Sequence, residues 1–579
     1  MIESSRKGLD FLFVHTDAGT SPLPFEVFLP PLGLIQIATY LNAQGFRSRV
    51  VDTRDVKFSL GWFADYLSEA RPAWIGFSAY TDTIFAVGHL IEVVRTVSPS
   101  SRIAIGGAHA TVCDEESLKE TAPDVVVRGE GETPCAELLH KSKLSGVKGI
   151  SFLRRKKIVR TPPPPLLDLD SLPSPDYSVV EGHKEIPYGF AVSTGRGCPY
   201  RCAFCAAGTL GFSVRSRSVA RVIEDIRAIR KQHGGNYFVI VDDTFTANIR
   251  RTEAFCREIK KIGGGSDLFW YAEGRVDRLA RRPSILKTMR EAGCAFLQFG
   301  VESGDQKVIK AYRKNIVTED SVGLVAACAG EGILTHAGFI VGGPFESDQT
   351  LSNTHKLAAK LLEVSRGFLS TRFEYLNPMP ATDIFMRPER YGLTLLDPRL
   401  YTSVGFDNCV TETESLSRND IIRRKSEMTN EALAATSKRV LSTDGQSMKR
   451  LRHLHDTLGN IHPSLLFLDV KDWKSYFKNW LEAIHLKAER FSQFTPRAGK
   501  NFRDLIPARV GMFNVDEGGR YCIPALEIFL SEDESDLFHY CSGKLSSSEI
   551  AVILGKKEEE IGKTLLSLEN KRIIVYRTF

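Results

Sequence analysis

The sequence predicts an α/β protein with two parallel-sheet units followed by a mostly helical C-terminal region. Short apolar runs rich in Val, Ile and Phe alternate with helical stretches over residues 1–145, and the same pattern returns over residues 187–385. Prolines crowd the stretch between these two units. Apolar strands that alternate with helices are typical of parallel sheets covered on both faces.

Composition narrows the class of protein. The chain has 579 residues, 42% of them hydrophobic and 25% charged, which indicates a globular protein of more than one domain. A net charge of +6 gives no case for nucleic-acid binding, and no apolar run approaches the length of a membrane span. The 11 cysteines show no disulfide pattern, so we expect a reducing, cytoplasmic location.

The first unit, residues 1–145, is expected to be a doubly wound, Rossmann-like sheet. Its predicted strands are 11–14, 48–52, 74–78, 102–106 and 124–127, with a helix over 32–44 after the first strand. In such sheets, ligands bind beyond the carboxyl ends of the strands. Residues 78–81, 106–109 and 129–132 fall there, and their glycines would let a large ligand approach the backbone. A Pro-rich linker, residues 146–186, then leads to the second unit.

The second unit, residues 187–385, is expected to be a partial (β/α)6 TIM-type barrel. Its predicted strands are 190–193, 237–241, 268–272, 296–301, 335–341 and 368–376. Most end in polar residues or glycines, and chemistry in such barrels lies at the carboxyl ends of the strands.

The remaining chain divides into a helical region, residues 386–505, and a small unit, residues 506–579. The small unit is predicted to contain helices near 533–541, 547–554 and 557–570 and a strand at 573–576, which resembles a winged-helix module. Ser546 or Ser547 would cap the second helix, with Glu549 in its first turn. A packing or dimerisation role is the first interpretation, and peptide docking and DNA binding are the alternatives.

Three cysteines, Cys198, Cys202 and Cys205, form a C-x3-C-x2-C loop after the first barrel strand. Three thiolates in one loop suit a [4Fe–4S] cluster that keeps one iron without a protein ligand. The alternative is a structural zinc site, but such a site normally has four ligands, and no second cysteine pair lies nearby. The other eight cysteines are expected to be buried apolar residues.

This loop, with Phe204 before its third cysteine, resembles the cluster loop of the radical S-adenosylmethionine (SAM) superfamily. The resemblance implies that SAM binds the open iron, that Phe204 lies near the adenine, and that one electron cleaves SAM to a 5′-deoxyadenosyl radical. The barrel-end residues implied as SAM contacts are Arg275 for the carboxylate, Glu302 for the ribose, and Ser303, Gly304, Gly342 and Gly343 for backbone approach. A salt bridge at the barrel rim is the alternative for Arg275 and Glu302.

The motifs at residues 30–34, 106–111 and 127–132 resemble, in this order, the cobalamin-binding domain that precedes many radical SAM enzymes. The resemblance covers residues 8–145. It implies a cobalamin site formed by Pro31, Ser78, Thr81, Gly106, Gly107, His109, Gly129, Glu130 and Glu132.

One departure concerns the cobalt ligand. Classical cobalamin proteins carry a D-x-H-x-x-G turn after the first strand, whereas residues 15–19 here do not fit that pattern. We therefore expect the nucleotide tail of the cofactor to be displaced without a histidine on cobalt. His15 is the alternative ligand, and His109 is expected to serve in hydrogen bonding or packing.

Asp242 and Asp243, with Phe245, recur in the cobalamin-dependent subgroup, and we expect them to line the space between corrin and SAM. A helix N-cap is the alternative role for one of them. Tyr271, Tyr375 and Asn377 are candidate substrate contacts.

The two resemblances together imply an enzyme that transfers a methyl group from SAM, via methylcobalamin, to an unactivated carbon of a small metabolite, amino acid or peptide. A non-methylating enzyme of the same class (cyclisation, ring contraction or oxidation) and a non-enzymatic cobalamin sensor are the alternatives. A flavodoxin or ferredoxin is the expected electron donor, and neither nucleic acid nor membrane is expected as a partner.

Overall fold

The computed structural model describes residues 8–16, 29–54, 58, 60–182, 189–210, 213–396, 409–459, 461–469, 506–509, 514–515, 521–523, 528–541, 546–570 and 574–577. Parts of the sequence predictions lie outside these ranges, among them residues 17–19 of the turn after His15, residues 183–186 of the linker, residues 397–408 and 470–505 of the helical region, and position 573 of the last strand.

The N-terminal unit is built on a seven-stranded sheet in the order β2-β1-β3-β4-β5-β6-β7. Its strands are β1 (Phe11–His15), β2 (Ser48–Asp52), β3 (Trp74–Ser78), β4 (Arg102–Gly106), β5 (Val125–Val127), β6 (Ile150–Arg154) and β7 (Lys157–Arg160). The first five are parallel, which confirms the doubly wound class. The antiparallel hairpin β6–β7 adds two strands to this sheet, within the stretch predicted as linker.

Alternating residues of the strands bury the two faces of this sheet under different helices. Phe11 and Phe13 pack in one core with α1 (Leu32–Ala43) and α6 (Glu132–His140). Leu12 and Val14 face the opposite core, which contains α2 (Leu60–Ala70), α3 (Ile84–Val97), α4 (Ala108–Val112) and α5 (Asp114–Glu120). This alternation follows from the two-residue period of a strand.

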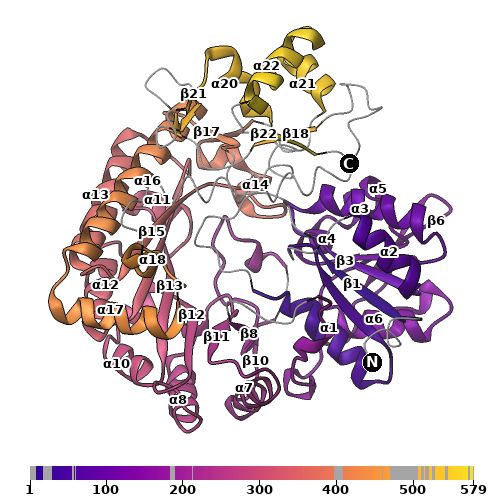
Figure 1. Ribbon diagram of the computed structural model, residues 1–579, viewed down its shortest axis with the longest axis horizontal. Helices are drawn as coiled ribbons and strands as arrows, with labels where there is room; N and C mark the ends of the chain where they lie inside the picture. Colours follow the sequence, from indigo (N-terminus) through magenta and orange to yellow (C-terminus); the bar gives the residue numbers. More distant parts are fainter. Residues whose placement is uncertain are drawn as a thin grey trace.

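The second unit is a six-stranded parallel sheet in the order β8-β11-β12-β13-β14-β15, and Figure 1 shows it beside the indigo N-terminal unit. Its strands are β8 (Phe190–Val192), β11 (Tyr237–Ile240), β12 (Phe269–Gly274), β13 (Cys294–Glu302), β14 (Leu334–Val341) and β15 (Leu369–Tyr375). The helices between them are α7 (Val219–His233), α8 (Ile249–Lys260), α9 (Val276–Ala280), α10 (Ser284–Glu291), α11 (Gln306–Ala311), α12 (Asp320–Glu331) and α13 (Asp348–Val364). The predicted partial barrel is confirmed.

The C-terminal helices close one end of the barrel. After α16 (Arg418–Leu441) and α17 (Gly445–Leu458), Leu465 and Phe467 of α18 (Pro463–Asp469) pack in one core with the first residues of β11, β12 and β14. His462, just before α18, lies 3.0 Å from the Ser370 hydroxyl and 2.9 Å from the Thr335 carbonyl oxygen. The amino end of the barrel is therefore filled with side chains.

The last unit carries α20 (Glu532–Tyr540), α21 (Ser547–Leu554) and α22 (Glu558–Asn570), and Figure 1 shows it in yellow at the top of the view. These helices lie where the sequence predicted them. Ser546 caps α21 and exchanges side-chain and backbone hydrogen bonds with Glu549. Strand β22 (Ile574–Arg577) pairs with β18 (Ile506–Arg509), and β19 (Asn514–Val515), β20 (Tyr521–Ile523) and β21 (Ile528–Phe529) form a separate sheet. The winged-helix resemblance stays a prediction. Within the described ranges, every helix is too short or too polar to cross a bilayer.

Candidate functional site

The cysteine loop leaves the barrel between two short strands, β9 (Gly195–Arg196) and β10 (Arg215–Ser216), which pair with each other. Cys198, Cys202 and Cys205 are all half-buried, whereas six of the other seven cysteines described are buried. The three thiols lie close enough to interact: burial, and then the charges of Cys202 and Cys198, raise the pKa of Cys205 to about 11.

This donor set fits a [4Fe–4S] cluster with one iron free of protein ligands. Three thiols from one loop are present, and the loop between β9 and β10 holds no fourth cysteine. Across the ranges that the structure describes, no group of His, Cys, Asp and Glu side chains is arranged around a single metal ion. The assignment of the three cysteines as ligands stays a prediction.

Arg275, at the end of β12, is buried beside the cysteine loop. Its Nε donates to Asp277 Oδ1 at 2.7 Å, and its guanidinium carbon lies 3.7 Å from the centre of the Tyr200 ring. Burial raises the pKa of Cys202, while the charges of Lys314 and Arg275 act in the opposite direction. The Nη2 of Arg275 is buried with no hydrogen-bond partner among the described residues. An unmet donor next to the open side of the loop fits the predicted contact with the SAM carboxylate.

Glu302 ends β13 in a strained conformation. Its φ is +65°, and the pairing of β13 with β14 shifts register between Gly300 and Glu302. This buried carboxylate accepts a hydrogen bond from Lys314 Nζ at 2.5 Å. Positive φ values at bulky residues are rare and cluster at functional sites. The rim salt bridge considered for Glu302 is therefore present, and its predicted contact with the ribose stays a prediction.

The glycines predicted to approach SAM are held by buried side chains. Gly304 N and Ser303 Oγ lie 2.9 Å and 3.1 Å from Thr354 Oγ1. The N–H groups of Gly342 and Gly343 donate to Glu346 Oε2 at 2.6 Å and 2.9 Å. This carboxylate fixes the turn after β14, although no motif marked it in the sequence.

The turn after β14 also packs against Tyr312, whose ring contacts Phe204. A Cβ on Gly343 would lie 1.9 Å from the Tyr312 hydroxyl, so only glycine fits there. Phe204 meets the Tyr312 ring edge-on, with ring centres 5.0 Å apart. Phe204, Tyr312 and Gly343 therefore pack together in one contact group.

The two aspartates after β11 have different surroundings. Asp242 accepts hydrogen bonds from the backbone N–H groups of Thr194 and Gly195 at 2.6 Å and 3.1 Å, so it fixes the start of the cysteine loop. Asp243 instead borders a cavity, and burial raises its pKa. Phe245 lies in the hydrophobic core against Phe255 and Trp270 rather than in that cavity.

The three candidate substrate residues lie on or directly after barrel strands β12 and β15. The Tyr271 hydroxyl donates to Glu273 Oε1 at 3.4 Å, and burial together with the charge of Asp243 raises the pKa of Glu273 to about 7. Tyr375 lies 4.2 Å below the Lys425 ammonium, and Asn377 Nδ2 donates to the Tyr375 carbonyl. Their role as substrate contacts stays a prediction.

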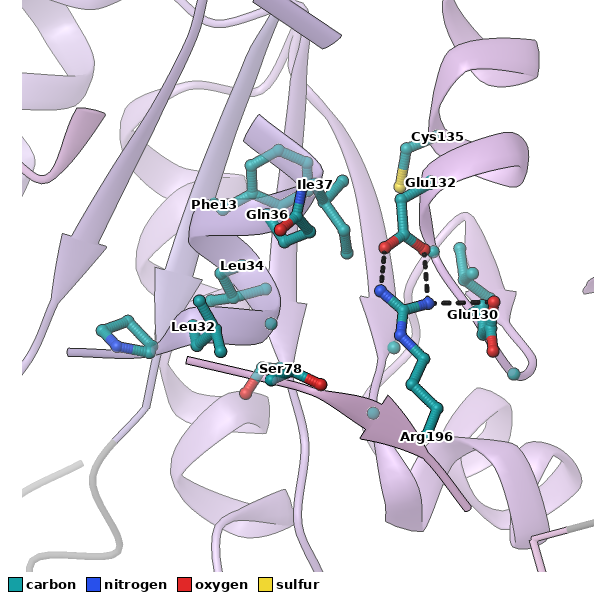
Figure 2. A pocket seen from close by; sticks show the side chains of 18 of the residues that line it. Phe13, Leu32, Leu34, Gln36, Ile37, Ser78, Glu130, Glu132, Cys135 and Arg196 are labelled. Carbon is teal, nitrogen blue, oxygen red and sulfur yellow. Dashed lines mark hydrogen bonds and ion pairs between the residues drawn. The ribbon is translucent and has the colours of Figure 1, made fainter. Parts of the chain in front are cut away.

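A cavity of about 450 Å³ lies between the N-terminal sheet and the start of the barrel. Figure 2 shows Phe13 of β1 and Leu32, Leu34 and Ile37 of α1 around it. The predicted residues that line it are Pro31, Ser78, Gly106, Gly107, Gly129, Glu130, Glu132 and Asp243. Gly195, Gly197, Ala207 and Leu210 line its barrel side. The cavity therefore reaches both flanks of the cysteine loop.

Glycines in the lining of this cavity would give a large ligand such as a corrin close access to the backbone. A Cβ on Gly33 would meet nothing within 4 Å, so that wall is open. A Cβ on Gly107 (φ +103°) would lie 2.7 Å from the Ala79 carbonyl oxygen, and only glycine lets the turn run that close. Leu169 and Leu172, from the Pro-rich stretch, cover another side.

The histidines of the N-terminal unit differ in position. His15 lines the cavity, with its Nδ1 3.5 Å from the Ser78 hydroxyl. His109 is buried instead against Thr81, with 3.1 Å between Nδ1 and Oγ1, and burial lowers its pKa to about 4. Among the described residues that line the cavity, neither His109 nor Thr81 appears. This position agrees with the hydrogen-bonding role expected for His109.

Glu130 and Glu132 do line the cavity, but arginines from the barrel hold both carboxylates. Arg196 Nη1 lies 2.9 Å from Glu130 Oε2, and its Nη2 lies 2.5 Å from Glu132 Oε1; Figure 2 shows this guanidinium between the two. Arg215 also contacts Glu130. Sequence analysis did not identify these arginines, because no motif pairs them with residues in another domain.

Comparisons with protein families match both units. The B12 binding domain matches residues 24–139, and the Radical SAM superfamily matches residues 192–358. An uncharacterized methyltransferase from Pyrococcus horikoshii is 29% identical over 65% of this chain and 82% of its own length. An anaerobic magnesium-protoporphyrin IX monomethyl ester cyclase from Rubrivivax gelatinosus is 29% identical over 60% of this chain and 65% of its own length.

Solved structures support the same fold. The radical SAM methyltransferase TsrM from Kitasatospora setae, with cobalamin and a [4Fe–4S] cluster bound, aligns with a TM-score of 0.58 and 16% identity over 78% of this chain and 99% of TsrM. The cobalamin-dependent radical SAM enzyme OxsB, with aqua-cobalamin and SAM bound, aligns with a TM-score of 0.57 and 16% identity over 84% of this chain and 79% of OxsB.

Proposed function

We propose that this chain, a cobalamin-dependent radical SAM enzyme that uses a [4Fe–4S] cluster, SAM and cobalamin, transfers a methyl group from SAM to an unactivated carbon. The substrate class we propose is a small metabolite, an amino acid or a peptide. Methyl transfer is supported by a relative whose name gives it as a methyltransferase and which matches 65% of this chain.

The observation that carries the proposal is the extent of the cavity. It begins at the carboxyl end of the N-terminal sheet and reaches Gly197 and Ala207, on either side of the three cysteines. A ligand on the N-terminal sheet would therefore share one space with a ligand on the cysteine loop. Transfer of a group between two bound molecules needs this proximity.

The residues of this chain would bind and orient the reactants. When bound, the cluster supplies the electron that cleaves SAM, and the cobalamin carries the methyl group. Arg275 would hold the SAM carboxylate, because it has an unmet buried donor next to Cys202. Glu302, held by Lys314, would accept hydrogen bonds from the ribose hydroxyls. Asp243 borders the cavity and would face the space between SAM and cobalamin.

Oxidative cyclisation is the second candidate. It is favoured by the relative from Rubrivivax gelatinosus, whose name gives it as a cyclase and whose identity to this chain is also 29%. Such a reaction would leave no methyl group from SAM in the product, so labelling separates the two candidates.

The decisive experiment is anaerobic reconstitution of the full chain with iron, sulfide and hydroxocobalamin, followed by a screen of amino acids, peptides and small metabolites with methyl-labelled SAM. Label in a product, at a carbon, supports methyl transfer. A modified product without label, formed together with 5′-deoxyadenosine, supports the second candidate. If SAM stays intact with every substrate and reductant, both are wrong.

We also propose a flavodoxin or ferredoxin as the electron donor and a cytoplasmic location. Both rest on the requirements of an oxygen-sensitive cluster. Reduction of the reconstituted chain by either protein, followed by the electron paramagnetic resonance signal of the reduced cluster, tests the first.

A further inference from the structure

Both stems of the cysteine loop meet one carboxylate of the N-terminal unit. The loop leaves the barrel through β9 and returns through β10, and Arg196 and Arg215 are directly paired across these strands. Arg196 Nη1 lies 2.9 Å from Glu130 Oε2, while Arg215 contacts the other oxygen, Oε1. Glu130 therefore connects the entry and the exit of the loop to the turn after β5.

A second carboxylate strengthens this connection. Glu132, whose side chain is only 3% exposed, lies 2.5 Å from Arg196 Nη2 and is the first residue of α6. The N-terminus of a helix favours a negative charge. Buried ions are costly unless they are paired, so these carboxylates need the arginines in place. The turn after β5 and the stems of the loop should therefore become ordered together.

The same contacts shape the cavity. Glu130, Glu132 and Arg196 all line it, together with Gly129 and Gly131 of the turn and Gly195 and Gly197 of the loop stem. A shift of the stem would move the wall on the barrel side and release the turn on the opposite side. The shape offered to a corrin thus depends on the position of the cysteine loop.

The cysteine loop in turn depends on its cluster. Between the stems, Cys198 and Cys205 are only half-buried, and the Cys198 thiol lies 3.6 Å from the Thr244 hydroxyl. A cluster bound by all three thiols would tie residues 198–205 together and so hold both stems in register.

We propose that the cluster and cobalamin bind cooperatively, and that Glu130 is the positioning residue that couples the two sites. Ordered stems place Arg196 and Arg215 on Glu130, and Glu130 then fixes the turn that borders the corrin. By thermodynamic linkage, cobalamin must stabilise the cluster by the same factor. The proposal concerns the binding of two cofactors, so it holds whichever reaction the enzyme performs.

The test compares the cobalamin affinity of the full chain with and without its cluster, measured anaerobically by corrin absorbance. The cluster should tighten cobalamin binding by at least about fivefold, the lower end of typical coupling between sites. In Glu130→Gln, most of the difference between the two dissociation constants should be lost, because only the contact of Arg196 with Glu132 then joins the loop to the N-terminal unit. Glu130→Asp keeps the charge on a shorter arm, so it should restore part of the difference.

Two further variants exclude a general loss of structure. Arg215→Gln removes one of the two loop-side partners of Glu130 and should reduce the difference, as Glu130→Gln does. Glu115→Gln removes an exposed, ion-paired carboxylate of the same domain, away from the cavity, and should leave the difference intact. The proposal is wrong if wild-type affinity for cobalamin is the same with and without the cluster, or if both Glu130→Gln and Arg215→Gln keep the wild-type ratio.

Discussion

The carboxyl ends of the two parallel sheets are lined by different kinds of residues. Beyond the N-terminal sheet, the cavity is bordered mostly by glycines and apolar side chains, with no atom within 4 Å of a Cβ on Gly33 and with Gly107 against the Ala79 backbone. Its charged lining at Glu130, Glu132 and Arg196 is confined to the side that meets the barrel. The barrel rim instead carries charged side chains, and many are already paired: Glu302 with Lys314, and Arg275 with Asp277. The cavity would therefore recognise a ligand mainly by its shape, whereas the barrel rim would recognise one by charged side chains that are already held in place.

This difference teaches where each kind of substitution should act. A flat, large ligand is recognised by close backbone approach, so added volume should harm the cavity most. A charged ligand is recognised by groups held in place before it arrives, so loss of charge or of a thiolate should harm the rim most. The following substitutions test that contrast, from the largest expected effect to the smallest.

Cys202→Ala should produce the largest effect. Because a cluster held by two thiols of one loop lacks a third protein ligand, the variant should lose its iron, its sulfide and all cleavage of SAM. At saturating cobalamin it should keep the corrin absorbance, since the cavity walls are intact. Iron and sulfide analysis and visible spectra measure both outcomes.

Cys113→Ala is the matched control, because Cys113 is also half-buried but lies in the N-terminal unit. It should keep the cluster. A full cluster spectrum in Cys202→Ala would contradict the ligand assignment, and an empty corrin site at saturating cobalamin would break the contrast between the two regions.

Gly33→Leu should harm only the cavity. Gly33 lies in the first turn of α1, where a Cβ meets nothing within 4 Å, so the side chain can be accommodated but occupies space needed by the ligand. Overpacking costs of about 1–3 kcal/mol correspond to cobalamin binding weakened by about fivefold to about 150-fold. Cluster content should stay close to that of the wild type. Corrin absorbance titrations provide the affinity.

Gly323→Leu is the control for this change. Gly323 is another helical glycine with open space around its Cβ, but it lies on the exposed face of α12. It should leave cobalamin affinity unchanged. Equal weakening in both variants would mean that the effect of Gly33→Leu comes from the helix and not from the cavity.

Much of the fold could be predicted because each buried parallel strand corresponds to a short, continuous run of apolar residues in the sequence. Runs such as Phe11–His15 and Trp74–Ser78 are continuous and apolar, and the structure has strands there. The hairpin β6–β7 escaped prediction because its turn, residues 154–157, is a run of basic residues and prolines follow it. An edge hairpin of this kind buries little apolar surface, so its pattern is weak.

The candidate site was predictable only in part. Spacing alone pointed to the three cysteines, but the charged contacts join residues distant in sequence. Arg196 and Glu132 are 64 residues apart, and nothing near either one marks the other. Glu346 escaped notice because its partners are backbone N–H groups, which every residue except proline offers.

Glu346→Gln tests the rim with a smaller change. Burial raises the pKa of Glu346 to about 7 from a value of 4.5, so between these values the folded chain binds more protons than the unfolded chain. The contribution of Glu346 to the free energy of unfolding is therefore greatest below pH 4.5. It is lost as the pH rises through about 7, by on the order of 3 kcal/mol. Glutamine still accepts the hydrogen bonds of Gly342 and Gly343 but does not titrate, so the decrease in Tm from pH 5 to pH 8 should become shallower.

Glu273, whose pKa is also raised to about 7, contributes a slope of the same sign, so the decrease should not vanish. Glu363→Gln is the control: Lys360 holds the pKa of this exposed carboxyl below its usual value, so it acts only below the tested window. An unchanged slope in Glu346→Gln would show that the buried carboxyl is ionised throughout.

Ser218→Ala should produce the smallest effect, because it acts behind both regions. The Ser218 hydroxyl oxygen accepts a hydrogen bond from the Arg221 N–H at 3.2 Å and caps α7, directly after the second stem of the cysteine loop. Loss of such a cap costs about 1 kcal/mol. The side chain is exposed and outside the cavity, so Tm should fall slightly while cluster content and cobalamin affinity stay unchanged. A loss of either cofactor would mean that the start of α7 holds the second stem of the cysteine loop in place. Cofactor binding would then depend on α7 as well as on the cavity lining and the charged residues of the barrel rim.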